Sequence, residues 1–160
     1  MKTAYLSLGS NLGDREQNLD KALEHLELGG VHVARRSSVY ETEPQDLRDQ
    51  PWFLNMVVEV ETRLFPLQLL AAVLRIERDL GRERLVPKGP RIVDIDILLY
   101  GPHVVNLPQL QIPHLALPER RFVLEPLVEI APDLRHPVLG KSMRELLAAV
   151  SGQIVRVRKT

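Results

Sequence analysis

Two hydrophobic periods alternate along the first hundred residues, and their order limits the folds open to this chain. Residues 3–9, 31–43, 52–62 and 91–99 are rich in β-branched and aromatic side chains with a period of two, which is typical of strands. Apolar side chains recur every three or four positions over residues 19–26 and 69–80, which indicates helices. The predicted order is therefore strand, helix, strand, strand, helix, strand.

This order is the split βαβ or ferredoxin-like arrangement, an α+β fold with an antiparallel sheet and both main helices on one face. The opposite face of the sheet is then available for other contacts. Asp14 and Gln17 are placed to cap the first helix, Pro66 suits the first turn of the second, and Gly81 can end it.

A C-terminal extension follows this core. Residues 103–114 predict a hairpin, residues 118–132 a short helix, and residues 142–152 a last helix that Ser142 and Glu145 open as a capping box. No repeat or linker divides the chain, so we expect a single domain over residues 1–160.

Charge and composition exclude several classes of protein. Lys plus Arg and Asp plus Glu each number 21, which argues against a general nucleic-acid binder or a polybasic membrane binder. The absence of Cys excludes disulfides and thiolate metal sites. No apolar run approaches the roughly 20 residues of a membrane span, and the N-terminal run is too short for a signal peptide. We expect a soluble, cytoplasmic, monomeric protein without nucleic-acid or membrane partners.

The last predicted strand, "GPRIVDIDILLYG" over residues 89–101, contains two carboxylates that strands rarely tolerate. Side chains two apart share a face, so Asp94 and Asp96 lie together with Leu98, at Cα separations of roughly 6–7 Å for the acidic pair. The other face is predicted to hold Val93, Ile95, Ile97 and Leu99. Two such carboxylates repel each other unless a cation neutralises them, and Mg²⁺ prefers carboxylate and phosphate oxygens.

Two interpretations of the acidic pair stay open on the residues alone. The carboxylates could hold Mg²⁺, or they could blunt a strand edge and pair with neighbouring arginines. A loop rich in Gly and Pro precedes the pair and carries Arg82, Arg84, Lys88 and Arg91. Guanidinium groups match phosphate oxygens, although a solvated surface loop would have the same composition.

Phe53 and Asn55 share a face of the third strand, where they offer an apolar surface beside an amide that can donate and accept. A heteroaromatic ligand would use both groups, but on the residues alone a Phe at this position is more often a core residue. The same two interpretations apply to Phe122 and His114.

Six segments taken together identify a family resemblance. They are "YLSLGSNLGD", "SSVYETEP", "FLNMVVEVET", "RIERDLGRER", "GPRIVDIDILLYG" and "IPHLALPERRFVLEPLVEIAPDL". In this order the chain resembles the 6-hydroxymethyl-7,8-dihydropterin pyrophosphokinase family of the folate pathway, from about Ala4 to Asp133.

The resemblance implies a Mg²⁺-dependent transfer of the β,γ-diphosphate of ATP to the pterin hydroxymethyl oxygen, leaving AMP. It implies that Asp94 and Asp96 hold two Mg²⁺ ions and that Asp96 can accept the hydroxyl proton. The implied catalytic residues are Arg82, Arg84, Arg91 and Asp96. The implied pterin-binding residues are Thr42, Glu43, Pro44, Phe53, Asn55, Asp94, Arg120 and Phe122. The implied ATP-binding residues are Glu77, Arg82, Arg84, Arg91 and His114.

The sequence departs from the family pattern at two positions, and two other functions are alternatives to this interpretation. Lys88 stands where the family often has Trp, and Leu115 stands where many relatives have a polar or aromatic residue. The first rival is a non-catalytic ferredoxin-like module that binds a nucleotide or metal. The second is a kinase that moves only the γ-phosphate of ATP.

Overall fold

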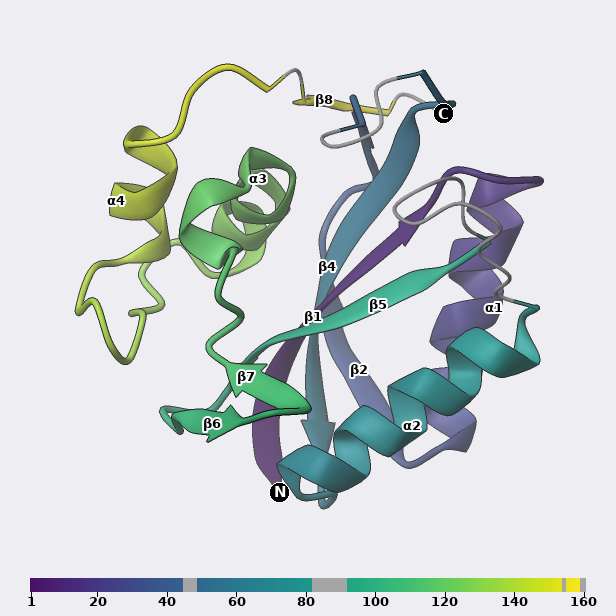
Figure 1. The fold of residues 1–160 in the computed structure, drawn as a ribbon, viewed down its shortest axis with the longest axis horizontal. Helices are drawn as coiled ribbons and strands as arrows, with labels where there is room; N and C mark the ends of the chain where they lie inside the picture. The colour runs from purple at the N-terminus through teal and green to yellow at the C-terminus, as the bar shows by residue number, and fades with distance from the viewer. Residues whose placement is uncertain (45–48, 82–91, 154, 159–160) are drawn as a thin grey trace.

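The computed structural model describes residues 1–44, 49–81, 92–153 and 155–158. Figure 1 shows a sheet with two long helices on one side and two short helices on the other. In chain order the elements are β1 (Lys2–Ser10), α1 (Arg15–Leu28), β2 (Val31–Arg36), β3 (Tyr40–Thr42), β4 (Phe53–Thr62), α2 (Pro66–Asp79), β5 (Asp94–Tyr100), β6 (Val105–Leu107), β7 (Leu110–Ile112), the 3-10 helix η1 (Leu117–Glu119), α3 (Arg121–Ile130), α4 (Met143–Ala148) and β8 (Val155–Val157).

The main sheet is antiparallel and runs in the order β5-β1-β4-β3-β8, with β2 also paired to β4. This confirms the predicted α+β, ferredoxin-like arrangement. The predicted strand over residues 31–43 is two strands, because β2 pairs with one half of β4 and β3 with the other. The strand β8, which pairs with β3, was not predicted from the sequence.

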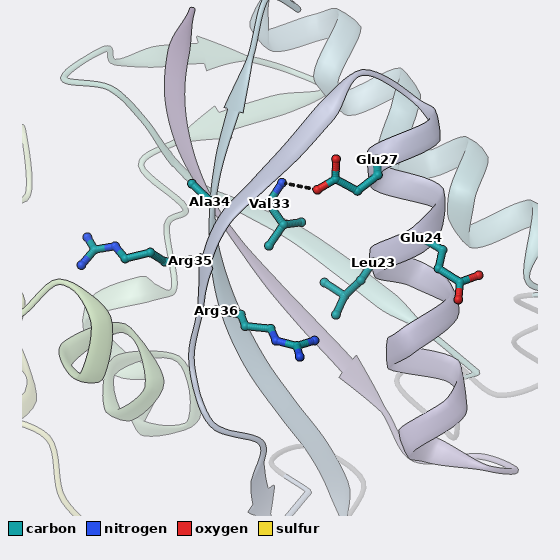
Figure 2. Close-up of a pocket in the computed structure, with 7 residues that line it drawn as sticks. All are labelled: Leu23, Glu24, Glu27, Val33, Ala34, Arg35 and Arg36. Carbon is teal, nitrogen blue, oxygen red and sulfur yellow. Dashed lines mark hydrogen bonds between the residues drawn. The ribbon is translucent and has the colours of Figure 1, made fainter.

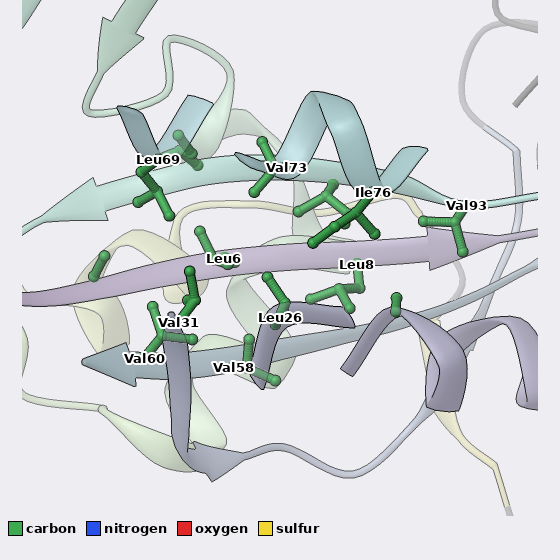
Figure 3. Close-up of a cluster of buried hydrophobic side chains, with 14 of the residues drawn as sticks. Leu6, Leu8, Leu26, Val31, Val58, Val60, Leu69, Val73, Ile76 and Val93 are labelled. Atoms are coloured by element: carbon green, nitrogen blue, oxygen red, sulfur yellow. The ribbon is translucent and has the colours of Figure 1, made fainter. Parts of the chain in front are cut away.

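The main core lies between the sheet and the helices α1 and α2 (Figure 3). Leu6 and Leu8 of β1 lie in one cluster with Leu69, Val73 and Ile76 of α2, and all five are buried. The predicted helix starts are confirmed. The Asp14 carboxylate accepts a hydrogen bond from the Gln17 backbone N–H at 3.1 Å, and Pro66 is the first residue of α2.

A second core lies on the opposite face of the sheet, under α3 and α4. It contains Leu98 and Leu99 of β5, so the prediction that Leu99 faces the same side as Ile97 is wrong. The register explains the difference: Tyr5 pairs with Leu99 while Leu6 pairs with Ile97, which leaves Leu98 as an extra residue. Such a bulge breaks the alternation of side chains along the strand.

The other predicted extension elements are confirmed: the β6–β7 hairpin, α3 and α4, with Ser142 and Glu145 in a capping box. Among the described residues, no helix combines the length and the apolar character that a lipid bilayer would require for crossing.

His136 predicts a pH dependence of stability in the turn before α4. Its ring is buried, and its Nδ1 accepts hydrogen bonds from the backbone N–H groups of Val138 and Leu139 at 3.2 and 3.1 Å. Burial lowers the pKa of His136, so the folded protein binds its proton less readily than the unfolded chain. The stabilisation is present above the ordinary pKa of about 6.5 and declines as the pH falls below it.

We therefore expect the free energy of unfolding, measured by urea titration, to decrease from pH 7.5 to pH 5.5. In His136→Asn this decrease should be smaller. His103→Asn, which changes an exposed ring, serves as the control and should keep the wild-type slope. Equal slopes in His136→Asn and the wild type would contradict this account.

Candidate active site

The two acidic side chains of β5 lie beside β1 on the sheet face opposite α1 and α2. Asp94 pairs with Gly9 and Asp96 pairs with Ser7, while Gly9 also pairs with Asn55 of β4. Directly paired residues share a face, so the acidic pair and the Asn55 amide lie on the same side of the sheet. The predicted shared face of the two carboxylates is confirmed.

Asp96 lies between two groups that can carry positive charge. Its Oδ1 is 3.9 Å from Nε2 of His114, and its Oδ2 is 3.8 Å from an Nη of Arg120. All three side chains remain about a quarter to a third exposed, so solvent screens these ion pairs. The arrangement concentrates both signs of charge at one place that water and ligands can reach.

His114 presents a defined ring nitrogen to Asp96. Its backbone N–H donates to the carbonyl of Leu98 at 3.0 Å, and its Nδ1 accepts from the backbone N–H of Ala116 at 3.2 Å. The neutral ring therefore carries its proton on Nε2, the nitrogen that faces Asp96. Burial lowers the pKa of His114, and the charge of Asp96 partly opposes this shift, so the net effect favours the neutral ring.

Asn55 and Thr42 form a buried polar pair next to Phe53. Thr42 pairs with Phe53 in the register of β3 and β4, and the Asn55 Nδ2 donates to the Thr42 Oγ1 at 2.5 Å. Both polar side chains are buried, whereas Phe53 is half-buried. An amide held in this way presents fixed polar atoms beside an aromatic ring.

Gly9 is a site residue that sequence analysis missed. A Cβ at Gly9 would lie 2.5 Å from Oδ1 of Asn55, so only glycine lets the amide approach β1 this closely. The quoted motif "YLSLGSNLGD" contains this glycine, but the close approach depends on the pairing of β1 with β4.

Arg120 connects the second aromatic residue to the acidic pair. Its guanidinium carbon lies 5.5 Å from the centre of the Phe122 ring, while the same side chain reaches Asp96. Phe122 is in the first turn of α3, which packs on the sheet face that carries Asn55, and its ring packs against the second core. Phe122 thus comes to the same side of the sheet as Phe53.

Glu77 reaches β5 from α2. Its carboxylate is buried and accepts a hydrogen bond from the backbone N–H of Ile95 at 2.8 Å. Because Ile95 separates the two acidic residues, this bond fixes the strand that presents Asp94 and Asp96. The implied contact of Glu77 with ATP stays a prediction.

Three predicted arginines, Arg82, Arg84 and Arg91, lie outside the described residues, as does Lys88. Among the described residues, no group of three or more His, Cys, Asp or Glu side chains could hold a metal ion. Asp94 and Asp96 nevertheless offer the hard oxygen atoms that Mg²⁺ prefers, and Mg²⁺ commonly binds one or two carboxylates plus substrate phosphates. The donor chemistry of the pair fits Mg²⁺.

A separate pocket lies between α1 and β2 (Figure 2) and contains none of the predicted site residues. On its rim, Glu27 accepts a hydrogen bond from the backbone N–H of Val33 at 2.8 Å. Arg35 points to the other side of β2 and pairs with Glu59 at 2.7 Å. Nothing in the pocket resembles the acidic site.

A sequence model of the 7,8-dihydro-6-hydroxymethylpterin-pyrophosphokinase (HPPK) family matches residues 5–132. The chain belongs to this HPPK family. A protein of Methylorubrum extorquens, 2-amino-4-hydroxy-6-hydroxymethyldihydropteridine pyrophosphokinase, is 48% identical over 149 residues, which are 92% of this chain and 93% of that protein. The protein of the same name from Bacillus subtilis is 48% identical over 128 residues, 79% of this chain and 77% of that protein.

Longer relatives are similar to this chain over only part of their own length. It is 45% identical over 157 residues to the folic acid synthesis protein fol1 of Schizosaccharomyces pombe and covers 98% of its own length there. The chain spans about a fifth of the length of that protein and of its Pneumocystis carinii counterpart. A wild-type Plasmodium falciparum HPPK-DHPS crystal structure with pteroate has a TM-score of 0.74 at 19% identity, over 92% of this chain and 42% of that one, and supports the fold alone.

The HPPK match confirms the predicted family resemblance, whose limits were Ala4 and Asp133. All of the predicted site residues lie within residues 5–132. The last predicted helix, observed as α4, lies outside the matched segment, and so does β8.

Proposed function

We propose that this chain transfers the diphosphate of ATP to 6-hydroxymethyl-7,8-dihydropterin, giving AMP and the pterin diphosphate, as a step of folate biosynthesis. The observation that carries the proposal is the placement of Asp94 and Asp96 beside Asn55 on one sheet face, in a chain of the HPPK family. The names of its bacterial relatives support the same activity. The proposal includes a cytoplasmic monomer whose partners are these two small molecules.

The pterin is proposed to bind in a slot, here called the pterin slot, formed by Thr42, Glu43, Pro44, Phe53, Asn55, Asp94, Arg120 and Phe122. The rings of Phe53 and Phe122 would stack on the heteroaromatic ring, and such contacts contribute about 0.5–1.5 kcal/mol beyond area burial. Because Asn55 donates to Thr42, its Oδ1 would accept a hydrogen bond from the pterin edge. The backbone of residues 42–44 would complete the recognition of that edge.

The triphosphate is proposed to lie over the acidic pair. Asp94 and Asp96 would hold two Mg²⁺ ions, which neutralise phosphate charge when bound. The Nε2–H of His114 and the guanidinium of Arg120, both within 4 Å of Asp96, would donate to phosphate oxygens. Arg82, Arg84 and Arg91 are proposed to contact phosphates as well. Glu77 is proposed to lie beside the bound ATP.

The chemistry requires a nucleophile, a leaving group and a proton acceptor. The pterin hydroxyl oxygen forms a bond to the β-phosphorus, and the bond from that phosphorus to the oxygen bridging the α-phosphate breaks, so that AMP leaves. The hydroxyl proton is proposed to pass to the Asp96 carboxylate. Arg120 contacts both Phe122 and Asp96, so it would hold the hydroxymethyl group and the phosphates in line.

One incubation separates this proposal from both rivals. The protein is mixed with ATP, Mg²⁺ and hydroxymethyl dihydropterin, and the nucleotides are separated by chromatography; a reaction without pterin is the control. We expect one AMP for each pterin diphosphate formed. ADP as the stoichiometric product would indicate a γ-phosphate kinase, and bound ATP without any product would indicate a non-catalytic module.

A further inference from the structure

Gln153, near the C-terminal end of the chain, connects two parts of the proposed pterin slot. The residue is buried at 7% exposure, which is unusual for an amide. Its Oε1 accepts a hydrogen bond from the backbone N–H of Phe122 at 3.1 Å. Its Nε2 donates to the backbone carbonyl of Glu43 at 2.9 Å. One side chain therefore bonds to both sides of the slot.

This pair of bonds requires a side chain that both accepts and donates, as an amide does. The Phe122 N–H lies in the first turn of α3, where backbone donors have no partner within the helix, and the residue before the helix supplies no side-chain cap. The Glu43 carbonyl belongs to the segment that follows β3, and it accepts the other bond. A carboxylate could accept from Phe122 but could not donate to Glu43.

Gln153 is itself fixed from both sides. Its backbone carbonyl oxygen accepts a hydrogen bond from the Arg121 guanidinium at 3.3 Å. The chain then enters β8, which pairs with β3 so that Val155 lies opposite Thr42. Figure 1 shows this segment passing from α4 above α3 to the edge of the sheet. An anchored amide of this kind can hold two backbone segments at a constant separation.

We propose that Gln153 is a positioning residue that sets the width of the pterin slot and thereby the affinity for the pterin ring. This inference rests on the proposed function, because it assumes that the pterin binds between residues 42–44 and Phe122. Loss of the Gln153 bonds would let these segments separate and would weaken the stacking of the Phe122 ring. The ATP side would be spared, since Gln153 makes no hydrogen bond to Asp96 or His114 among the contacts of the described residues.

The test compares Gln153→Glu and Gln153→Asn with the wild type. Glu keeps the length and the acceptor but removes the donor, and Asn is too short to make both bonds at once. Gln111→Glu is the matched control, because Gln111 also donates through Nε2 to a backbone carbonyl, that of Leu107 in the β6–β7 hairpin, at 2.8 Å. The KM values for pterin and ATP, kcat and the thermal midpoint are measured for each protein.

We expect both Gln153 variants to raise the KM for pterin roughly tenfold or more, with the KM for ATP within about twofold of wild type. Gln111→Glu should leave both constants unchanged. An unchanged KM for pterin, an equal rise in both KM values, or failure of both Gln153 variants to fold would overturn the inference. Failure of the proposed function is distinct, since it would appear as the absence of AMP in the wild-type reaction.

Discussion

Asp96→Asn is expected to lower kcat by roughly a hundredfold or more while leaving the thermal midpoint unchanged. The substitution keeps the size of the side chain but removes the negative charge that would hold Mg²⁺ and accept the hydroxyl proton. The thermal midpoint should persist because the Asp96 side chain is 34% exposed, and its contacts with Arg120 and His114, at 3.8 and 3.9 Å, are long and screened by solvent. The effect therefore falls on the reaction and not on the fold.

The measurement is AMP formation at saturating ATP and pterin over a range of Mg²⁺ concentrations. Asp133→Asn is the matched control, since its carboxylate is 89% exposed and pairs only at the surface with Arg144. We expect wild-type kcat for Asp133→Asn. If Asp96→Asn turned over at nearly the wild-type rate at ordinary Mg²⁺, the metal and proton roles of Asp96 would both be wrong.

The sequence predicted the fold correctly where the side chains of a single strand alternate regularly between the two faces of the sheet. The shared face of Asp94 and Asp96 follows from the two-residue period of β5, and so does the burial of Ile95 and Ile97 against the helices. Leu99 was misplaced because the bulge at Leu98 arises in the pairing of β5 with β1. A bulge depends on two strands, so the sequence of one strand does not contain it.

The split of residues 31–43 into β2 and β3 has a similar cause. Both strands pair with β4, and the ten residues of β4 accommodate them one after the other. The segment between them stays bound, because the Ser37 N–H donates to the Val57 carbonyl at 2.9 Å. A continuous β-branched pattern therefore concealed a break that only the partner strand defines.

The site residues also fall into two groups: those that a local pattern places and those that it does not. Phe53 and Asn55 share a face by strand alternation, whereas the binding roles of His114, Arg120 and Phe122 were given by the family resemblance. Gln153 gave no local signal, because its bond to Glu43 joins residues 110 positions apart. Side chains whose role lies in distant backbone contacts are recognised only once the fold is known.

Gly9→Ala is expected to weaken pterin binding strongly, because the added Cβ would lie 2.5 Å from Oδ1 of Asn55. The Asn55 amide cannot move away at low cost, since it is buried and donates to Thr42. Overpacking of a buried site costs about 1–3 kcal/mol. If this cost displaces Asn55 from the pterin slot, pterin affinity should fall roughly ten- to a hundredfold.

Pterin binding to Gly9→Ala is measured by calorimetry in the presence of an unreactive ATP analogue, together with the affinity for the analogue alone. Gly29→Ala is the control, because Gly29 ends α1 away from the site and also has a negative φ of −90°. We expect wild-type pterin affinity for Gly29→Ala and a selective loss of pterin affinity for Gly9→Ala. Unchanged pterin affinity in Gly9→Ala would mean that the Asn55 amide does not contact the ring, and the position of the pterin slot on this face would have to be revised.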